Sequence, residues 1–202
     1  MSEAAKNFKT SFRTRMLYSL TSLGVATPAE AINGIIAFYI VDVMNLPATW
    51  FATFWFFYTI YNAFNNPVLG FFSDRTRSRW GRRIPYILFV GLPYAVTFAL
   101  LFTAPFDGRN NPVGLLLYFG AAIVAWEGLY TAIATGYYGL LPEMFSNYRE
   151  RTDVAAKMNI FQTIALVLGA ALPPLLAKIL GWPGMAYVLP VNSVIAIYVG
   201  YP

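Results

Sequence analysis

Long apolar runs separated by short polar or basic connections dominate this chain of 202 residues. A helix needs roughly 20 apolar residues to cross a bilayer. By that criterion the pattern predicts six spans, namely Leu17–Val43, Trp50–Ser73, Ile84–Pro105, Val113–Leu141, Val154–Leu180 and Gly184–Tyr201. We therefore expect an all-α polytopic membrane protein. Residues 1–16 would form a cytoplasmic segment, residues 17–202 a six-helix bundle, and residues 74–83 a basic cytoplasmic loop within it.

Composition supports lipid as the solvent for this chain. It is 58% hydrophobic and 11% charged, with a mean hydropathy of +0.54, whereas a soluble domain has about 25% charged residues. The absence of cysteine and histidine excludes disulfides, thiolate chemistry and nearly all transition-metal sites. No nucleophile–base pair is visible either. We therefore predict no enzymatic activity, no catalytic residue, no bound metal and no cofactor.

The basic residues divide unequally between the two sides that alternating spans create. One side receives Lys6, Lys9, Arg13, Arg15, Arg75, Arg77, Arg79, Arg82, Arg83, Arg149, Arg151 and Lys157, whereas the other receives Arg109 and Lys178. Cytoplasmic loops of membrane proteins carry an excess of lysine and arginine. We therefore expect an integral protein of the plasma (inner) membrane with both termini in the cytoplasm. This clustering indicates membrane topology rather than nucleic-acid binding.

Two carboxyl groups, Glu30 and Glu127, fall in the middle of predicted spans. Polar neighbours on or beside their helix faces are Asn33 in the first span and Tyr130, Thr131 and Tyr138 in the fourth. Charges at membrane depth are costly and mark functional sites. One interpretation is a cavity that binds a proton or a ligand. The alternative is a pair of neutral carboxyls hydrogen-bonded to neighbouring helices.

The second span carries Asn62 and Asn66 on one face, one turn apart. A polar ligand site or a weak cation site is one interpretation of this pair. Hydrogen bonding between helices, a common use of asparagine in membranes, is the other.

The run from Asn66-Pro67 through Pro85-Tyr86 resembles the glycoside-pentoside-hexuronide:cation symporters, the melibiose-symporter-like branch of the major facilitator superfamily. Four further segments resemble the family in the same order: Tyr39–Pro47, Tyr137–Glu143, Arg149–Arg151 and Gly181–Ala186. The resemblance covers nearly the whole chain. It extends only over the N-terminal six-helix half of the twelve-helix fold of that family.

The resemblance implies a cytoplasmic latch formed by Gly70, Asp74, Arg75, Gly81, Arg82 and Arg83. It also implies stacking aromatics at Tyr130 and Tyr138. The aspartates of the family's cation site fall on Asn62, Asn66 and Ala134, and its span-five arginine falls near Asn159. A hard cation needs several oxygen ligands including formal charge, so the Na⁺ site of the family is expected to be lost here.

Two functions follow from these expectations. The first is a major facilitator transporter, similar to sugar or small-solute symporters, without the Na⁺ site. The alternative is a truncated, non-transporting subunit of a larger membrane complex. In both cases the expected partners are the lipid bilayer and a second helical bundle, supplied by the chain's own C-terminal half, another copy or a larger complex. The first function adds a small-molecule solute, and neither involves nucleic acid.

Overall fold

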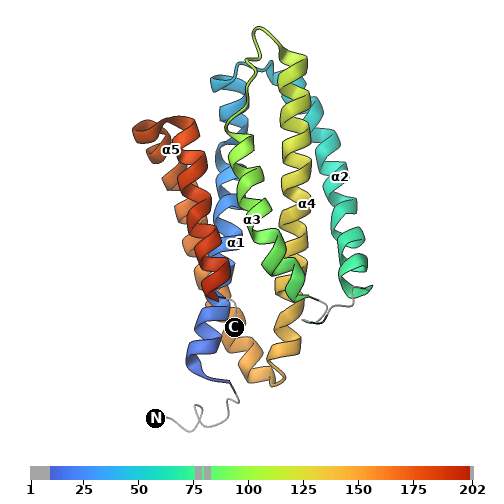
Figure 1. The fold of residues 1–202 in the computed structure, drawn as a ribbon, viewed down its shortest axis with the longest axis vertical. Coiled ribbons are helices and arrows are strands. Elements are labelled where there is room, and N and C mark those ends of the chain that lie inside the picture. Colours follow the sequence, from blue (N-terminus) through green and yellow to red (C-terminus); the bar gives the residue numbers. More distant parts are fainter. Residues whose placement is uncertain (1–9, 76–78, 80–82, 201–202) are drawn as a thin grey trace.

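The computed structural model describes residues 10–75, 79 and 83–200, and it is helical almost throughout. The elements are α1 (Phe12–Phe38), the π-helix η2 (Tyr39–Val43), α2 (Ala48–Arg75), α3 (Ile84–Leu101), α4 (Pro112–Met144) and α5 (Tyr148–Gly200). Successive helices run up and down the long axis of the bundle (Figure 1). The described part of the chain contains no β-strand, as the apolar run lengths predict.

Helix α5 is interrupted at Gly181, where the backbone adopts φ 74° and ψ 169°. A positive φ of this size suits glycine, which has no Cβ to clash with the backbone. The interruption divides α5 into two helical segments, 148–180 and 182–200, and the second segment folds back beside the first (Figure 1). The fifth and sixth predicted spans therefore lie within one numbered helix, on either side of this break.

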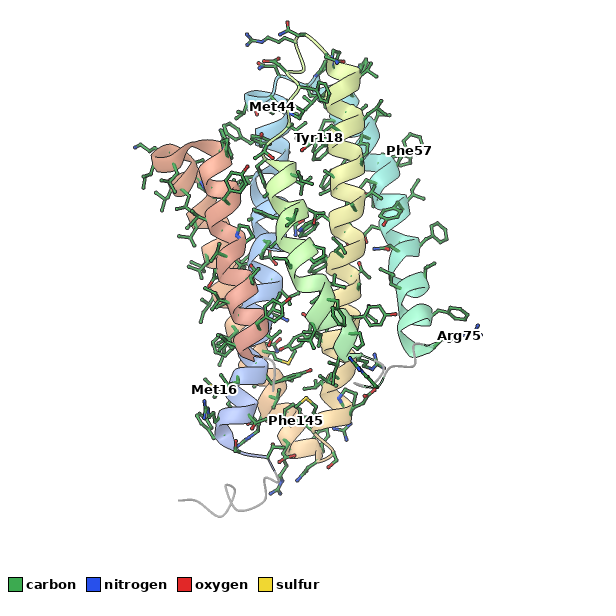
Figure 2. The ribbon with its side chains drawn as sticks, in the orientation of Figure 1. Met16, Met44, Phe57, Arg75, Tyr118 and Phe145 are labelled. Carbon is green, nitrogen blue, oxygen red and sulfur yellow. The ribbon has the colours of Figure 1, made fainter. Side chains whose placement is uncertain are left out.

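Four of the helical stretches are long and apolar enough to cross a membrane: Phe12–Val43, Ile84–Leu101, Pro112–Met144 and Tyr148–Gly200. Helix α2 is not among them, and its asparagines at 62, 65 and 66 lower its hydropathy. Many large apolar side chains face outward on the described surface, including Phe57, which is 63% exposed and projects from α2 (Figure 2). An apolar exterior of this extent is compatible with lipid rather than water.

Helix α1 packs closely against both segments of α5, and glycines make this possible. A Cβ placed on Gly24 would lie 2.8 Å from the Cβ of Ala196, in the second segment. A Cβ placed on Gly169, in the first segment, would lie 2.6 Å from the Cβ of Glu30. Close backbone approach at small residues is the usual way that membrane helices associate. One side of α1 is thus fixed against α5.

The opposite side of the bundle is built from α2, α3 and α4. Buried aromatic residues pack between these helices, with Tyr94 of α3 stacked on Trp126 of α4, and Phe119 of α4 against Phe54 of α2. Near the end of the bundle where the chain starts, Tyr18 and Tyr137 exchange hydrogen bonds, because each hydroxyl donates to the other residue's carbonyl, at 2.6 and 2.9 Å. This pair joins α1 to α4 and leaves the space further along these helices to be lined by other side chains.

Candidate functional site

A cavity of about 500 Å³ opens between α1, α2 and α4. Its lining residues are Ala29, Glu30, Ile32 and Asn33 from α1, Trp55, Tyr58, Thr59, Asn62 and Ala63 from α2, and Trp126, Glu127 and Tyr130 from α4. Small-molecule sites commonly occupy 300–1,000 Å³, so the size suits a solute rather than a single ion. The cavity brings together five residues singled out by the sequence pattern: Glu30, Asn33, Asn62, Glu127 and Tyr130.

The carboxyl group of Glu127 is held in place by a tyrosine from the neighbouring helix. The Tyr58 hydroxyl donates a hydrogen bond of 2.8 Å to Oε2 of Glu127. Both side chains are buried, with 8% of Tyr58 and 6% of Glu127 exposed. Tyr58 is not among the site residues expected from the sequence, although it stands one turn before Asn62 on the same helix face, and that spacing is a usable signal.

A second polar contact between α2 and α4 lies two turns further along α2 and one turn further along α4. Asn65 Nδ2 donates a 2.8 Å hydrogen bond to Oγ1 of Thr131, and both residues are buried. Thr131 therefore contributes to the joint between the two helices and does not line the cavity. The two contacts fix how α2 is rotated against α4, which determines which of its side chains face the cavity.

Aromatic rings form much of the cavity wall. Trp126 stacks on Tyr130 with ring centroids 5.5 Å apart and planes within 8°. Trp55 and Tyr58 on α2 lie 4.9 Å apart. Trp126 is only 2% exposed, and its indole N–H has no hydrogen-bond acceptor among the described residues. The Oδ1 atom of Asn62 also lacks a partner within the described part of the chain.

The remaining residues singled out by sequence lie elsewhere. Tyr138 is 42% exposed, and its hydroxyl accepts a 2.8 Å hydrogen bond from Gln162 Nε2. Asn159 is exposed on α5. Neither lines the cavity. Asn66 belongs to α2, but its side chain lies outside the described residues.

The expected latch is described in part. Nε of Arg83 pairs with Oε1 of Glu143 at 2.8 Å, so the start of α3 is tied to the end of α4. A Cβ on Gly139 would lie 1.7 Å from Nη1 of Arg83, so this glycine makes room for the guanidinium. The Arg75 guanidinium lies 3.9 Å from the centre of the Phe71 ring.

Three of the other latch positions lie outside the described residues. They are Gly81, Arg82 and the Asp74 side chain, whereas Gly70 falls within α2.

Charged residues at the same end join α1 to α5. Asp153 pairs with both Arg15 and Lys157. Burial raises the pKa of Asp153, but hydrogen bonds and attraction from Lys157 and Arg15 outweigh burial and hold that pKa below its usual value. The backbone N–H of Thr10 also donates a 2.8 Å hydrogen bond to Glu150 Oε1. These contacts lie beyond the apolar core and are separate from the cavity.

Comparison with known proteins agrees with this arrangement. Residues 17–200 match the family described as MFS/sugar transport protein. The chain is 33% identical over 183 residues to an uncharacterized symporter of Synechocystis, covering 89% of this chain and 33% of that protein. It is 25% identical over 195 residues to an isoprimeverose transporter of Lactiplantibacillus pentosus, covering 92% of this chain and 40% of that one.

A third relative is an inner membrane symporter of Escherichia coli, 26% identical over 144 residues, which cover 71% of this chain and 31% of that protein. The chain thus spans between 31% and 40% of the length of these curated relatives. These matches confirm the resemblance to the melibiose-symporter-like branch and the expectation of a transporter family rather than an enzyme family. The chain is an integral membrane protein that belongs to the MFS/sugar transport protein family.

Proposed function

We propose that this chain forms the N-terminal six-helix bundle of a transporter that carries a sugar or a similar small solute through the cavity between α1, α2 and α4. The observation that supports this most directly is the lining of the cavity, which combines carboxyls, an amide and stacked aromatic rings in one space. Aromatic faces accommodate sugar rings, and carboxylates and amides hydrogen bond to hydroxyls. One relative is itself named as a transporter of a sugar, isoprimeverose.

Solute uptake by the full-length protein that contains this chain is the direct test. The protein would be reconstituted in liposomes, with uptake of radiolabelled isoprimeverose, xylose and lactose measured by counterflow. We expect saturable uptake of at least one sugar, and we expect Glu127→Gln to reduce it. Correctly inserted protein that exchanges none of these solutes would favour the alternative, a non-transporting subunit of a membrane complex.

The proposed topology has six spans with both termini in the cytoplasm of the plasma membrane. In it α2 also crosses the bilayer and α5 crosses twice, once on each side of Gly181. The arrangement of basic residues supports this orientation. One end of the bundle is marked by Met16, Arg75 and Phe145 in Figure 2. Most of the described lysines and arginines belong to segments at that end. The excess of positive charge is expected on the cytoplasmic side.

Cysteine labelling can test that topology because the chain has no native cysteine. Ser146→Cys lies in the exposed connection between α4 and α5, and Asn110→Cys lies in the exposed connection at the opposite end. An impermeant maleimide added to intact cells should label the cysteine at position 110 and leave the one at position 146 unlabelled. The reverse pattern would overturn the orientation.

We further propose that Na⁺ does not drive transport. Asn62 and Ala134 stand where the resemblance places aspartates, and no group of three or more acidic residues able to hold a metal ion occurs among the described residues. Amide oxygens without carboxylate charge bind hard cations weakly. Replacing Na⁺ with choline should leave solute affinity unchanged, and a Na⁺-dependent increase in affinity would contradict the proposal.

A second helical bundle is proposed to cover the cavity. Left against lipid, the half-buried carboxyl of Glu30 would cost on the order of a few kcal/mol. The relatives are two to three times longer than the matched region, which favours the C-terminal half of the same polypeptide as the covering bundle. Residues 1–202 expressed alone should aggregate or associate, as measured by sizing in mild detergent. A stable, monodisperse monomer would argue against this partner.

A further inference from the structure

The charged side chains in the described lining of the cavity are acidic. Among the described residues, its lining contains two carboxyl groups, Glu30 and Glu127, and no lysine, arginine or histidine. The basic residues of the described chain lie at the ends of the bundle, in or next to the connections between helices. None of them is placed by this bundle to neutralise a carboxylate inside the cavity. A bound solute therefore meets a negative field from α1 and α4.

The two carboxyls are not equivalent. Glu127 already accepts the hydrogen bond from Tyr58 and is 6% exposed. Glu30 is half-buried, and it makes no hydrogen bond or ion pair with the other described residues. At its Cβ, Glu30 is backed by Gly169 of α5. Tyr130 lies within electrostatic range of both carboxyls. Glu30 is thus the carboxyl left to pair with a solute.

The remaining lining suits a hydroxylated cation. Trp55, Tyr58, Trp126 and Tyr130 surround the space, and the faces of aromatic rings attract organic cations. The indole N–H of Trp126 and Oδ1 of Asn62 have no partner among the described residues, although both residues belong to the lining. Both atoms are themselves buried, so hydrogen bonds to solute hydroxyls fall to lining side chains that reach the cavity surface, such as the exposed amide of Asn33.

We propose that this cavity selects solutes that carry a protonated amine on a hydroxylated frame, that is, amino sugars, with Glu30 as the counter-ion. This inference rests on the proposed transport function and narrows its substrate class. A neutral sugar would leave the Glu30 carboxylate without an opposite charge, and a uronate would be repelled by both carboxyls at low local dielectric. The aromatic wall and the exposed amide of Asn33 serve the hydroxylated part of the solute.

The test uses full-length protein in detergent and three matched probes: glucosamine, glucose and glucuronate. Binding is followed by quenching of tryptophan fluorescence at neutral pH. We expect glucosamine to bind about tenfold more tightly than glucose, as one hydrogen-bonded charge pair implies, and glucuronate to bind most weakly. Glu30→Gln should bring the affinities for glucosamine and glucose to within about twofold. Glu30→Asp should retain part of the preference, and Asp107→Asn, an exposed loop change, should retain all of it.

Two outcomes separate this inference from the transport function. Glucose bound as tightly as glucosamine, or an unchanged preference in a folded Glu30→Gln variant, would overturn the amine selectivity and leave sugar transport standing. If Glu30→Gln does not fold, the wild-type ranking and the Glu30→Asp variant decide the matter. Failure of all three probes to bind folded wild-type protein would overturn both the inference and the sugar class.

Discussion

The hydrogen bond between Tyr58 and Glu127 offers the sharpest test of how α2 is held. It is 2.8 Å long, it is buried, and it crosses directly from α2 to α4. Tyr58→Phe removes only the hydroxyl and keeps the ring in place beside Trp55. The substitution therefore isolates the polar contact from the packing of the aromatic wall.

The size of the effect can be worked out from two limits. Hydrogen bonds between membrane helices are worth about 0.6 kcal/mol on average and up to about 1.7 kcal/mol. Hydrogen bonds to charged groups in soluble proteins are worth about 1.5–3 kcal/mol. A buried bond to a carboxyl belongs near the overlap of these ranges. We therefore expect a coupling of about 1.5 kcal/mol, which is roughly a tenfold change in an equilibrium constant.

A double-mutant cycle measures this coupling. Tyr58→Phe, Glu127→Gln and the double variant of the full-length protein would be unfolded by denaturant in mixed micelles, and the free energies compared. Tyr61→Phe is the matched control, because its hydroxyl is exposed and lies 3.4 Å from the Val124 carbonyl. Additive effects of the two substitutions, within about 0.3 kcal/mol, would falsify the claim that this bond joins α2 to α4.

Three further predictions concern the packing and the charged end of the bundle. Gly169→Ala places a Cβ 2.6 Å from the Cβ of Glu30 and should lower the free energy of unfolding by about 1–3 kcal/mol. The control is Gly34→Ala, whose Cβ would meet nothing within 4 Å and which should change the free energy of unfolding by less than about 0.5 kcal/mol. The pKa of Asp153 is lowered from 3.8 in the folded protein, so the ionised carboxylate stabilises the fold fully above pH 3.8, and this stabilisation is lost as the pH falls below that value. In thermal melts between neutral pH and pH ~3, Asp153→Asn should therefore lose less stability on acidification than the unmodified protein does. Glu143→Gln breaks a partly exposed ion pair and should cost less than about 1 kcal/mol in denaturant titrations.

The helices could be predicted from sequence because a helix that crosses a bilayer needs an apolar run about as long as the bilayer core is thick. The predicted span Trp50–Ser73 lies within α2, Ala48–Arg75, and the predicted start at Ile84 is the observed start of α3. The expected interval between the last two spans, residues 181–183, contains the observed break at Gly181. Helix ends beyond the apolar run are harder to place, because caps and polar turns extend a helix without changing its hydropathy. Helix α5 accordingly begins at Tyr148, before the apolar run.

The residues that line the cavity could be predicted from sequence only where a polar side chain falls in the middle of an apolar run. Glu30, Glu127 and Asn62 stand out because polar groups are rare in apolar runs. Tyr58 and Trp126 do not stand out, since the chain contains 14 tyrosines and 5 tryptophans. Their roles depend on how α2 and α4 are rotated against each other, which periodicity within one helix does not specify. Tyr138 shares a face with Glu127 in projection, yet it lies too far along α4 to reach the cavity and contacts Gln162 instead.

Helix α1 combines two roles on different faces. Gly24 on α1 and Gly169 on α5 allow backbones to approach closely, so α1 and α5 behave as one packed unit. Glu30 and Asn33 face the cavity opposite α4. Because Tyr18 and Tyr137 tie α1 to α4 near one end of the bundle, the cavity walls are fixed relative to one another by contacts outside the cavity. A bundle joined in this way would move as a rigid body against a second bundle. Alternating access by rocking of two halves around a fixed site requires that property.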